Sequence, residues 1–368
     1  MSIGANDKVR VGIIGCGGIS NGKHMPALSK LKNVDMVAFC DLIPERAEAA
    51  AAKFGHGETK TYTDYRALLE DKSLDVVHVL TPNRAHSFIT VDALEAGKHV
   101  MCEKPMAINS AEAKKMLDAA KKYERKLTIG YQNRHRPDSL YMKQEALNGT
   151  FGEIYYAKAT AIRRRAVPTW GVFIKEYEQG GGPLIDIGTH SLDLTLWMMD
   201  NYTPKYCVGT TYHKLNDTPP EEQGNTWGPW KREEFTVEDA AFGFVVMENG
   251  ATVYVEATWA LNMLDPREAI TTICGTKAGA DMIGGLRING VRGGRQYTLT
   301  PSFSGGGVDF FEGGGNESPA EREARLWIDA VVNDKEVFVK PEQAYTVTRI
   351  LEGIYESSKS GNIHFFRN

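Results

Sequence analysis

Residues 9–20 read VRVGIIGCGGIS, and this stretch decides the fold that the sequence predicts. The apolar run Val9–Gly15 is typical of a strand that is buried on both faces. Gly15 and Gly17 then permit a tight turn and a close approach of the backbone to a pyrophosphate, and the segment that follows is expected to be helical. The N-terminus of such a helix offers N–H groups and the positive end of its dipole to phosphate. We therefore expect a nucleotide-binding domain to begin here.

The same alternation of apolar runs and helical patterns continues to about residue 132. Further apolar runs lie at 34–41, 76–80, 99–103 and 127–131. The segments between them are rich in Ala, Leu, Lys and Glu, which favour helices. Apolar strands that alternate with helices predict a parallel sheet with helices on both faces. We therefore assign residues 1–132 to a doubly wound α/β domain of the Rossmann type.

A different pattern begins after about residue 135. Alternating, β-branched and aromatic residues predict strands at 154–162, 206–213, 240–248, 251–260 and 269–275. Asn249-Gly250 supplies the positive φ angles of a tight hairpin turn. Helices are predicted at 191–199, 320–332 and 343–358, and loops rich in Pro and Gly at 214–234 and 301–318. We expect residues 133–368 to form an α+β domain, a mainly antiparallel sheet with helices on one face.

The composition excludes several classes of protein. The chain has 368 residues, 43 Lys and Arg against 47 Asp and Glu, and a net charge of −4. This length predicts two domains, and the near-neutral charge argues against nucleic acid as a partner. The apolar runs are too short for a membrane helix, and the N-terminus lacks the pattern of a secretory signal. The five cysteines form no C-x-x-C pair, so we expect no metal site, no disulfide framework and a reducing cytoplasmic location.

The candidate phosphate-binding turn comprises Gly15, Gly17, Gly18, Ile19 and Ser20. Ser20 stands where the usual motif has a third Gly or Ala, a small departure that is expected to loosen the packing of the helix against the strand.

Asp41 ends the second apolar run, 26 residues after Gly15. An acidic side chain there accepts hydrogen bonds from a ribose 2′-hydroxyl and repels a 2′-phosphate, so NAD is favoured over NADP. Because Arg46 lies nearby, use of both NAD and NADP is the alternative. The alternative interpretation is a tight turn that is followed by a capping Asp.

Polar residues also follow the third apolar run, at the sheet edge where ligands bind in such folds. Thr81-Pro82-Asn83 offers a hydroxyl and an amide beside a turn that Pro82 restricts, and His86 lies in the helix that follows. The alternative is that Asn83 simply caps this helix.

Glu103-Lys104-Pro105 ends the next apolar run, again at the carboxyl edge of the sheet. A cation here would lower the pKa of a substrate hydroxyl or stabilise a developing alkoxide. The alternative is a salt-bridged surface lysine. Gln132 and Arg134, after the sixth run, are candidates to contact the nicotinamide or the substrate.

A second cluster, GGGPLIDIGTH at 180–190, combines three glycines with Asp186 and His190. The two side chains share a face wherever the segment is helical, because they are four residues apart. A histidine beside a carboxylate is a natural general base near neutral pH, and Asp193 is a candidate to orient its ring. The alternative is a helix start with a core histidine.

Arg163 and Trp170 are candidates to bind a polyhydroxylated ring. Arg donates forked hydrogen bonds, and aromatic faces pack on the C–H surfaces of sugars. A solvated basic strand end is the competing interpretation.

GIIGCGGIS at 12–20, TPNRAH at 81–86, CEKP at 102–105 and GGGPLIDIGTHSLDL at 180–194 together resemble the Gfo/Idh/MocA family of nicotinamide-dependent oxidoreductases. The resemblance covers essentially the whole chain. It implies a Rossmann domain followed by a domain with a large open sheet, which binds substrate and forms homodimers or homotetramers. The final helix is able to pack back on the Rossmann domain.

The resemblance also assigns roles. The family's catalytic lysine falls on Lys104, its substrate-binding aspartate on Asp186 and its catalytic histidine on His190. The expected cofactor contacts are Gly15, Gly17, Gly18, Ile19, Ser20, Asp41, Arg46, Thr81, Pro82, Asn83, His86, Glu103, Lys104 and Gln132. The expected substrate contacts are Lys104, Arg163, Trp170, Asp186 and His190.

The expected reaction is NAD-linked oxidation of one secondary ring hydroxyl of a sugar, glycoside or cyclitol to a ketone. The Arg-rich strand end and the Pro-Thr-Trp loop are similar to those of members that act on glucosides at C3 or on inositols. An inositol dehydrogenase is therefore one alternative. Two others come from different classes of protein: an NAD-dependent glycosidase and a non-catalytic NAD-binding sensor.

Overall fold

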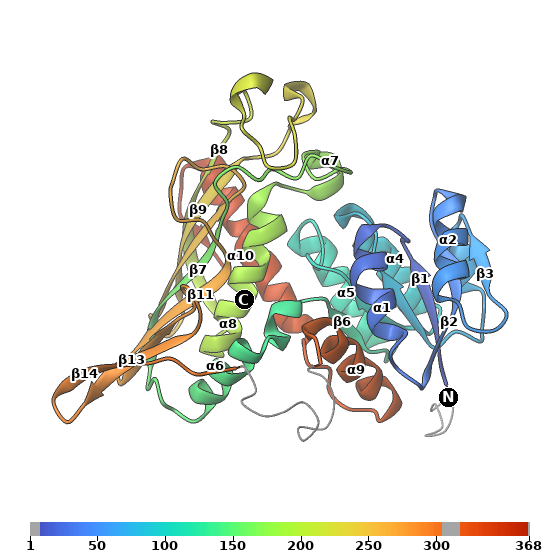
Figure 1. Ribbon diagram of the computed structural model, residues 1–368, viewed down its shortest axis with the longest axis horizontal. Coiled ribbons are helices and arrows are strands. Elements are labelled where there is room, and N and C mark those ends of the chain that lie inside the picture. Colours follow the sequence, from blue (N-terminus) through green and yellow to red (C-terminus); the bar gives the residue numbers. More distant parts are fainter. Residues whose placement is uncertain (1–7, 304–316, 367–368) are drawn as a thin grey trace. The chain divides into compact units, whose positions relative to one another are not determined.

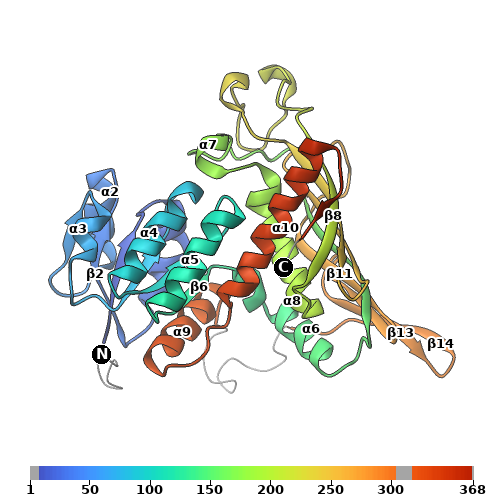
Figure 2. The same ribbon diagram turned by 180° about the vertical axis from the view of Figure 1, so that it is seen from behind.

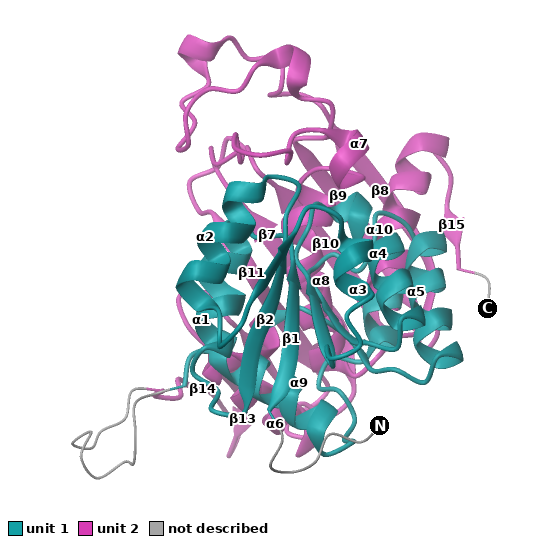
Figure 3. Cartoon of the chain, turned by 90° about the vertical axis from the view of Figure 1, so that its right-hand side faces the viewer, with its two compact units in different colours: residues 1–132, 317–345 teal, residues 133–316, 346–368 magenta. Residues whose placement is uncertain are grey.

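The computed structural model describes residues 8–303 and 317–366, and the chain divides into two compact units (Figure 3). The first unit comprises residues 1–132 and 317–345, and the second comprises residues 133–316 and 346–368. The sequence pattern assigned 317–345 to the second domain. These residues group with the first unit because Trp327, Ile328 and Val331 are buried in its core.

The first unit contains a parallel six-stranded sheet in the order β3-β2-β1-β4-β5-β6. Its strands are β1 (Val9–Ile14), β2 (Val34–Cys40), β3 (Lys60–Tyr62), β4 (Val76–Val79), β5 (His99–Cys102) and β6 (Leu127–Ile129). The strand order reverses between β1 and β4, and in such sheets ligands bind outside the carboxyl ends of the strands at this point. The predicted doubly wound α/β fold is confirmed.

Helices cover both faces of this sheet (Figure 3). On one face lie α1 (Met25–Leu28), α2 (Pro44–Phe54) and α9 (Pro319–Val332), whose apolar side chains share a core with β1 and β2. On the other face lie α3 (Tyr65–Leu69), α4 (Asn83–Glu95) and α5 (Ser110–Lys122). Ser318 and Glu321 form a capping box at the start of α9, which fixes where this helix begins.

The second unit contains a nine-stranded sheet in the order β14-β13-β12-β11-β7-β10-β9-β8-β15 (Figures 1 and 2). Only β7 and β10 pair in parallel among the described strands of this sheet, so the predicted mainly antiparallel sheet is confirmed. The strands are β7 (Ile154–Ile162), β8 (Pro204–Tyr212), β9 (Ala240–Met247), β10 (Thr252–Thr258), β11 (Arg267–Gly275), β12 (Ala278–Asp281), β13 (Arg287–Arg292), β14 (Arg295–Leu299) and β15 (His364–Phe365).

One face of this sheet is covered by α8 (Thr189–Met199) and α10 (Pro341–Ser360) (Figures 1 and 2). Gly209 and Gly243 permit the close packing of α10, because a Cβ atom at either position would lie within 2.6 Å of Ile354. Gly250 has a φ angle of 86° in the hairpin turn between β9 and β10, as predicted.

Some elements of the second unit were not predicted. The strands β12, β13 and β14 at one edge lack a strong apolar pattern, and every residue of β14 is exposed. The predicted loop 214–234 contains two short turns of helix, η4 (Pro220–Glu222) and η5 (Arg232–Glu234). Most of the predicted loop 301–318 lies outside the described residues. Within the described part of the chain, no helix is both long enough and apolar enough to span a membrane.

Candidate functional site

The glycine-rich turn leaves β1 with room for a ligand on its outer side. Gly15 has a φ angle of 95°, and a Cβ atom there would lie 2.5 Å from the carbonyl oxygen of Leu80. An added Cβ atom at Gly17 or Gly18 would meet no atom within 4 Å. The helical turn η1 (Ser20–His24) follows at once and continues into α1. Open backbone before a helix N-terminus fits the pyrophosphate of a dinucleotide.

Asp41 lies directly after β2 and contacts the glycine-rich turn. Its carboxylate accepts a hydrogen bond from the backbone N–H of Cys16 at 2.8 Å and another from that of Ile43 at 3.0 Å. The first bond ties the end of β2 to the turn after β1. Arg46 is exposed in the first turns of α2, the helix that follows Asp41. Ser20, the departure from the usual motif, is fully buried.

His86 contacts the loop after β4 through one nitrogen of its ring and the loop after β5 through the other. The two ring nitrogens of His86 lie 2.8 Å from the carbonyl oxygens of Pro105 and Thr81. Burial lowers the pKa of His86, although both contacts oppose this shift. His86 thus joins the loops that follow β4 and β5. Pro82, rather than Asn83, is the N-cap residue of α4, so the alternative interpretation of Asn83 as the helix cap is wrong, and its expected contact with the cofactor stays a prediction.

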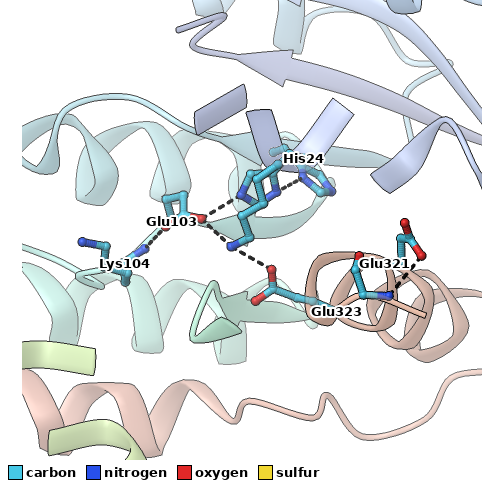
Figure 4. A network of polar contacts seen from close by, with 8 residues as sticks. His24, Glu103, Lys104, Glu321 and Glu323 are labelled. Carbon is cyan, nitrogen blue, oxygen red and sulfur yellow. Dashed lines mark hydrogen bonds and ion pairs between the residues drawn. The ribbon is translucent and has the colours of Figure 1, made fainter. Parts of the chain in front are cut away.

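Glu103 anchors the backbone beside Lys104 through a buried polar network (Figure 4). One carboxylate oxygen lies 2.7 Å from Lys23 Nζ and 2.7 Å from His24 Nε2. The other oxygen accepts a hydrogen bond from the backbone N–H of Lys104 at 3.0 Å. Lys23 Nζ also lies 2.8 Å from the carboxylate of Glu323 on α9. The sequence predicted Glu103 as a cofactor contact, and the structure places its side chain inside this network.

The charges of this network shift the ionisation of Glu103 and Lys23. Burial raises the pKa of Glu103, but Lys23 and His24 outweigh it and hold that pKa well below its usual value. Burial lowers the pKa of Lys23, and the two carboxylates raise it above its ordinary value. Lys23 is therefore a buried cation between the two buried side chains of Glu103 and Glu323.

In the second unit, Asp186 and His190 lie on one continuous helical segment. Asp186 belongs to the helical turn η3 (Leu184–Gly188), and His190 lies in the first turn of α8. Asp186 is 9% exposed, and its carboxylate accepts a hydrogen bond from Trp259 Nε1 at 3.1 Å. This bond holds the carboxylate against the end of β10.

Asp193, which was expected to orient His190, pairs with Arg134. Arg134 grips the Asp193 carboxylate with two hydrogen bonds of 2.9 and 2.6 Å, and both side chains are buried. Arg134 itself was predicted to contact the nicotinamide or the substrate, and this ion pair places it in the interior instead. Gln132 begins the short helix η2 (Gln132–His135) immediately before it.

The sequence analysis missed Glu238, which binds the backbone of the segment just before Asp186. Its buried carboxylate accepts hydrogen bonds from the N–H groups of Gly182 at 2.8 Å and Leu184 at 3.1 Å, and from the hydroxyl of Tyr355 at 2.7 Å. A Cβ atom would lie 2.2 Å from the Tyr355 hydroxyl at Gly181 and 2.2 Å from the Glu238 carbonyl oxygen at Gly182. Burial raises the pKa of Glu238 to about 7. The Glu-Asp pair before the apolar strand β9 was the available signal.

The remaining candidates follow β7. Arg163 forms an ion pair with Glu268, and Trp170 is half exposed on the loop beyond it. Lys104 belongs to the first unit, and Asp186, His190, Arg163 and Trp170 belong to the second. Among the described residues, no group of His, Cys, Asp and Glu could hold a metal ion.

Comparisons with known proteins identify the family. Residues 9–131 match the model of the oxidoreductase family with an NAD-binding Rossmann fold, and residues 140–281 match that of the GFO/IDH/MocA C-terminal domain. A D-glucoside 3-dehydrogenase of Escherichia coli is 32% identical over 96% of this chain and 96% of its own. An inositol 2-dehydrogenase of Salmonella typhimurium is 30% identical over 52% of this chain and 55% of its own.

The solved structures agree with this assignment of the fold. Levoglucosan dehydrogenase, in complex with NADH and levoglucosan, has a TM-score of 0.81 at 22% identity and covers 98% of this chain and all of its own. An aldose-aldose oxidoreductase from Caulobacter crescentus has a TM-score of 0.79 over the same shares, also at 22% identity. The first unit is an NAD-binding Rossmann domain, and the chain belongs to the Gfo/Idh/MocA family of oxidoreductases.

Proposed function

We propose that the protein oxidises a secondary ring hydroxyl of a glycoside to a ketone, with C3 of a glucoside as the favoured position. The observation that carries this proposal is the 32% identity to a D-glucoside 3-dehydrogenase along almost the full length of both chains. NAD, when bound, supplies the hydride acceptor for such a reaction. The carboxylate of Asp41 beside the glycine-rich turn supports NAD over NADP, because it would repel a 2′-phosphate.

The proposed chemistry of this chain's own residues is proton transfer and charge stabilisation. His190 accepts the proton of the reacting hydroxyl, with Lys104 as the alternative acceptor. Lys104 stabilises the alkoxide-like charge that develops on the oxygen. Asp186 holds a neighbouring hydroxyl, a role that its carboxylate, oriented by Trp259, is suited to perform. The backbone of Lys104 is anchored by Glu103, which limits the positions open to its side chain.

The face of the nine-stranded sheet opposite α8 and α10 is the proposed contact between copies of this chain. Val208, Phe244, Tyr254 and Lys158 are successive cross-strand partners on that face. The Phe244 and Tyr254 rings lie 5.1 Å apart, and 42% of Tyr254 is exposed. An aromatic face of this kind is typical of an interaction surface. Light scattering after size exclusion should give a homodimer or homotetramer for the native chain and smaller species for Tyr254→Asp.

A cytoplasmic location is proposed from the cysteines. All five are free thiols in the structure, and four of them are buried. Thiols of this kind suit a reducing compartment.

The experiment that tests the proposed function is NADH formation by the purified protein with NAD and a panel of substrates. We expect absorbance to rise with methyl and phenyl glucosides, and Lys104→Ala to lower turnover by orders of magnitude while NADH still binds. The partial similarity to inositol dehydrogenases makes myo- and scyllo-inositol the second candidate substrates. Oxidation of inositols alone would replace the proposal with a cyclitol dehydrogenase. Release of the aglycone without net NADH would indicate a glycosidase, and NADH binding without any turnover would indicate a sensor.

A further inference from the structure

Two tryptophans that are distant in sequence lie together on the second unit, on loops after β7 and before β9. The rings of Trp170 and Trp227 have centroids 4.8 Å apart and are nearly perpendicular. Trp170 is 51% exposed and Trp227 is 41% exposed, although such rings usually bury most of their surface. Phe173 extends the cluster, with its ring 5.8 Å from that of Trp170. The exposed rings require an explanation, since the other tryptophans near them, Trp230 and Trp259, are buried.

Hydrogen bonds make the two loops a rigid support for these rings. The Asn225 side chain accepts a hydrogen bond from the backbone N–H of Val167 at 2.8 Å, and its amide group donates to the carbonyl oxygens of Val167 and Gly228. Thr226 donates to the carbonyl oxygen of Arg165 through both its backbone N–H and its hydroxyl. The Thr169 hydroxyl donates to the carbonyl oxygen of Trp227. A surface that is already ordered binds a ligand with less loss of entropy than a mobile one.

The Trp227 ring contacts Arg163, the residue that follows β7. The guanidinium of Arg163 lies 5.3 Å from the centroid of Trp227, a cation–π contact, and forms two hydrogen bonds with Glu268. Burial lowers the pKa of Arg163, whereas the contact with Glu268 and the charge of Asp186 raise it above its ordinary value.

The loop that carries Trp170 and the turn that carries Asp186 share one buried core. Val167, on the tryptophan loop, and Ile187, next to Asp186, belong to the same buried cluster as Trp259. The loop that carries Trp170 and the turn that carries Asp186 therefore pack on one buried core of the second unit. With Asp186 proposed to hold a hydroxyl of the reacting ring, the exposed tryptophan pair is available to another part of the substrate.

We infer that Trp170 and Trp227 form a subsite for a ring-shaped aglycone, the part of a glycoside that is remote from the oxidised hydroxyl. The ligand class is a glycoside whose aglycone presents a flat apolar face, either an aryl ring or the C–H face of a second sugar. Aromatic rings bind such faces by stacking and edge contacts. The inference rests on the proposed function and names the substrate class more narrowly, since a free monosaccharide or an inositol would leave the pair unused.

The test is the ratio of kcat/KM for phenyl β-glucoside to kcat/KM for methyl β-glucoside. Cellobiose is run beside them to separate an aryl aglycone from a second sugar ring. We expect Trp227→Ala and Trp170→Ala each to lower this ratio by about tenfold, through KM rather than kcat. Trp227→Phe, which keeps an aromatic face, should keep most of the native ratio. Tyr155→Ala, an exposed aromatic at the opposite end of β7, is the matched control and should leave the ratio at its native value.

A second readout does not depend on turnover. Phenyl β-glucoside should quench tryptophan fluorescence of the protein with NADH present, and Trp227→Phe should weaken the quenching. If native protein oxidises both glucosides and the alanine variants keep the native ratio, the subsite is refuted while the proposed function stands. If no glucoside is oxidised, the proposed function itself fails. If the alanine variants form smaller oligomers than the native protein and keep its ratio of kcat/KM values, the tryptophan pair belongs to a contact between copies. That result would overturn the inference.

Discussion

Replacing Lys23 with Met should destabilise the first unit far more than the loss of an ordinary surface ion pair. Lys23 Nζ lies 2.7 Å from Glu103 and 2.8 Å from Glu323, and all three side chains are buried. Removing one partner of a buried pair costs about 3–5 kcal/mol, because the remaining charge stays buried. In a unit of about 160 residues, each kcal/mol lowers Tm by about 2–4 °C, so we expect a fall of about 6–20 °C.

The measurement is thermal unfolding of the full chain with and without NADH. Ligand binding raises the Tm of the unit that holds it, so the NADH-sensitive transition reports on the first unit. Lys8→Met is the control, because Lys8 pairs with Asp35 at 2.8 Å but is exposed. A pair of that kind is worth about 0–1 kcal/mol. If Lys23→Met lowers Tm no more than Lys8→Met does, the buried network does not stabilise the first unit more than a surface ion pair would.

A double variant and a pH series test the same cause. Lys23→Met combined with Glu323→Leu removes one unpaired anion, so it should regain part of the loss, with a coupling of about 0.5–3 kcal/mol. The depressed pKa of Glu103 gives native protein stability that is complete above pH 4.5 and is lost as pH falls toward the folded pKa. In Lys23→Met the two buried carboxyl groups lose the cation that they share, which favours their protonation, so the deficit relative to native protein should shrink from pH 7 to pH 5. A deficit that stays constant over this range would contradict the electrostatic explanation.

Three further predictions follow from contacts described above. Asp41→Ala removes the acceptor for the Cys16 N–H and the expected ribose contact, so calorimetric titration should give a Kd for NADH at least tenfold higher and less discrimination against NADPH; unchanged affinities would exclude the role. Gly182→Ala forces a shift at the Glu238 carbonyl oxygen, so it should lower the free energy of unfolding by about 1–3 kcal/mol and also lower turnover, while NADH binding is kept; native turnover would show that the turn can relax. Ser318→Ala removes the N-cap of α9 and should cost about 1 kcal/mol, seen as a loss of about 2–4 °C in the NADH-sensitive transition, whereas an equal loss in the other transition would place α9 outside the first unit.

The sequence predicted those features that depend on local patterns. The apolar strand before Gly15 and its alternation with helices were sufficient for the Rossmann sheet, and the Asn249-Gly250 turn was sufficient for the hairpin between β9 and β10. The sequence could not show which core α9 would join, because the apolar stripe with Trp327 fits any partner of complementary shape. The exposed strand β14 had no buried face to produce a pattern.

Side-chain pairing was the least predictable part of the site. Asp193 lies one helical turn from His190, and only the fold shows that Arg134 takes its carboxylate. Glu238 lies 56 residues from Gly182, so the acceptor for the glycine backbone is invisible to any short motif. Long-range contacts of this kind depend on the fold as a whole, whereas turns and caps depend on a few neighbouring residues.

The first unit consists of two segments that are far apart in the sequence, so its two parts are synthesised at different times. Residues 1–132 leave the ribosome long before residues 317–345, and at about 5–20 residues per second the interval is about 10–40 s. During that time Lys23 lacks Glu323, and the apolar surface that α9 covers has no partner. The nascent Rossmann segment therefore completes its core only after residues 317–345 have been made, and a gene fragment that ends at residue 132 would encode a protein prone to aggregation.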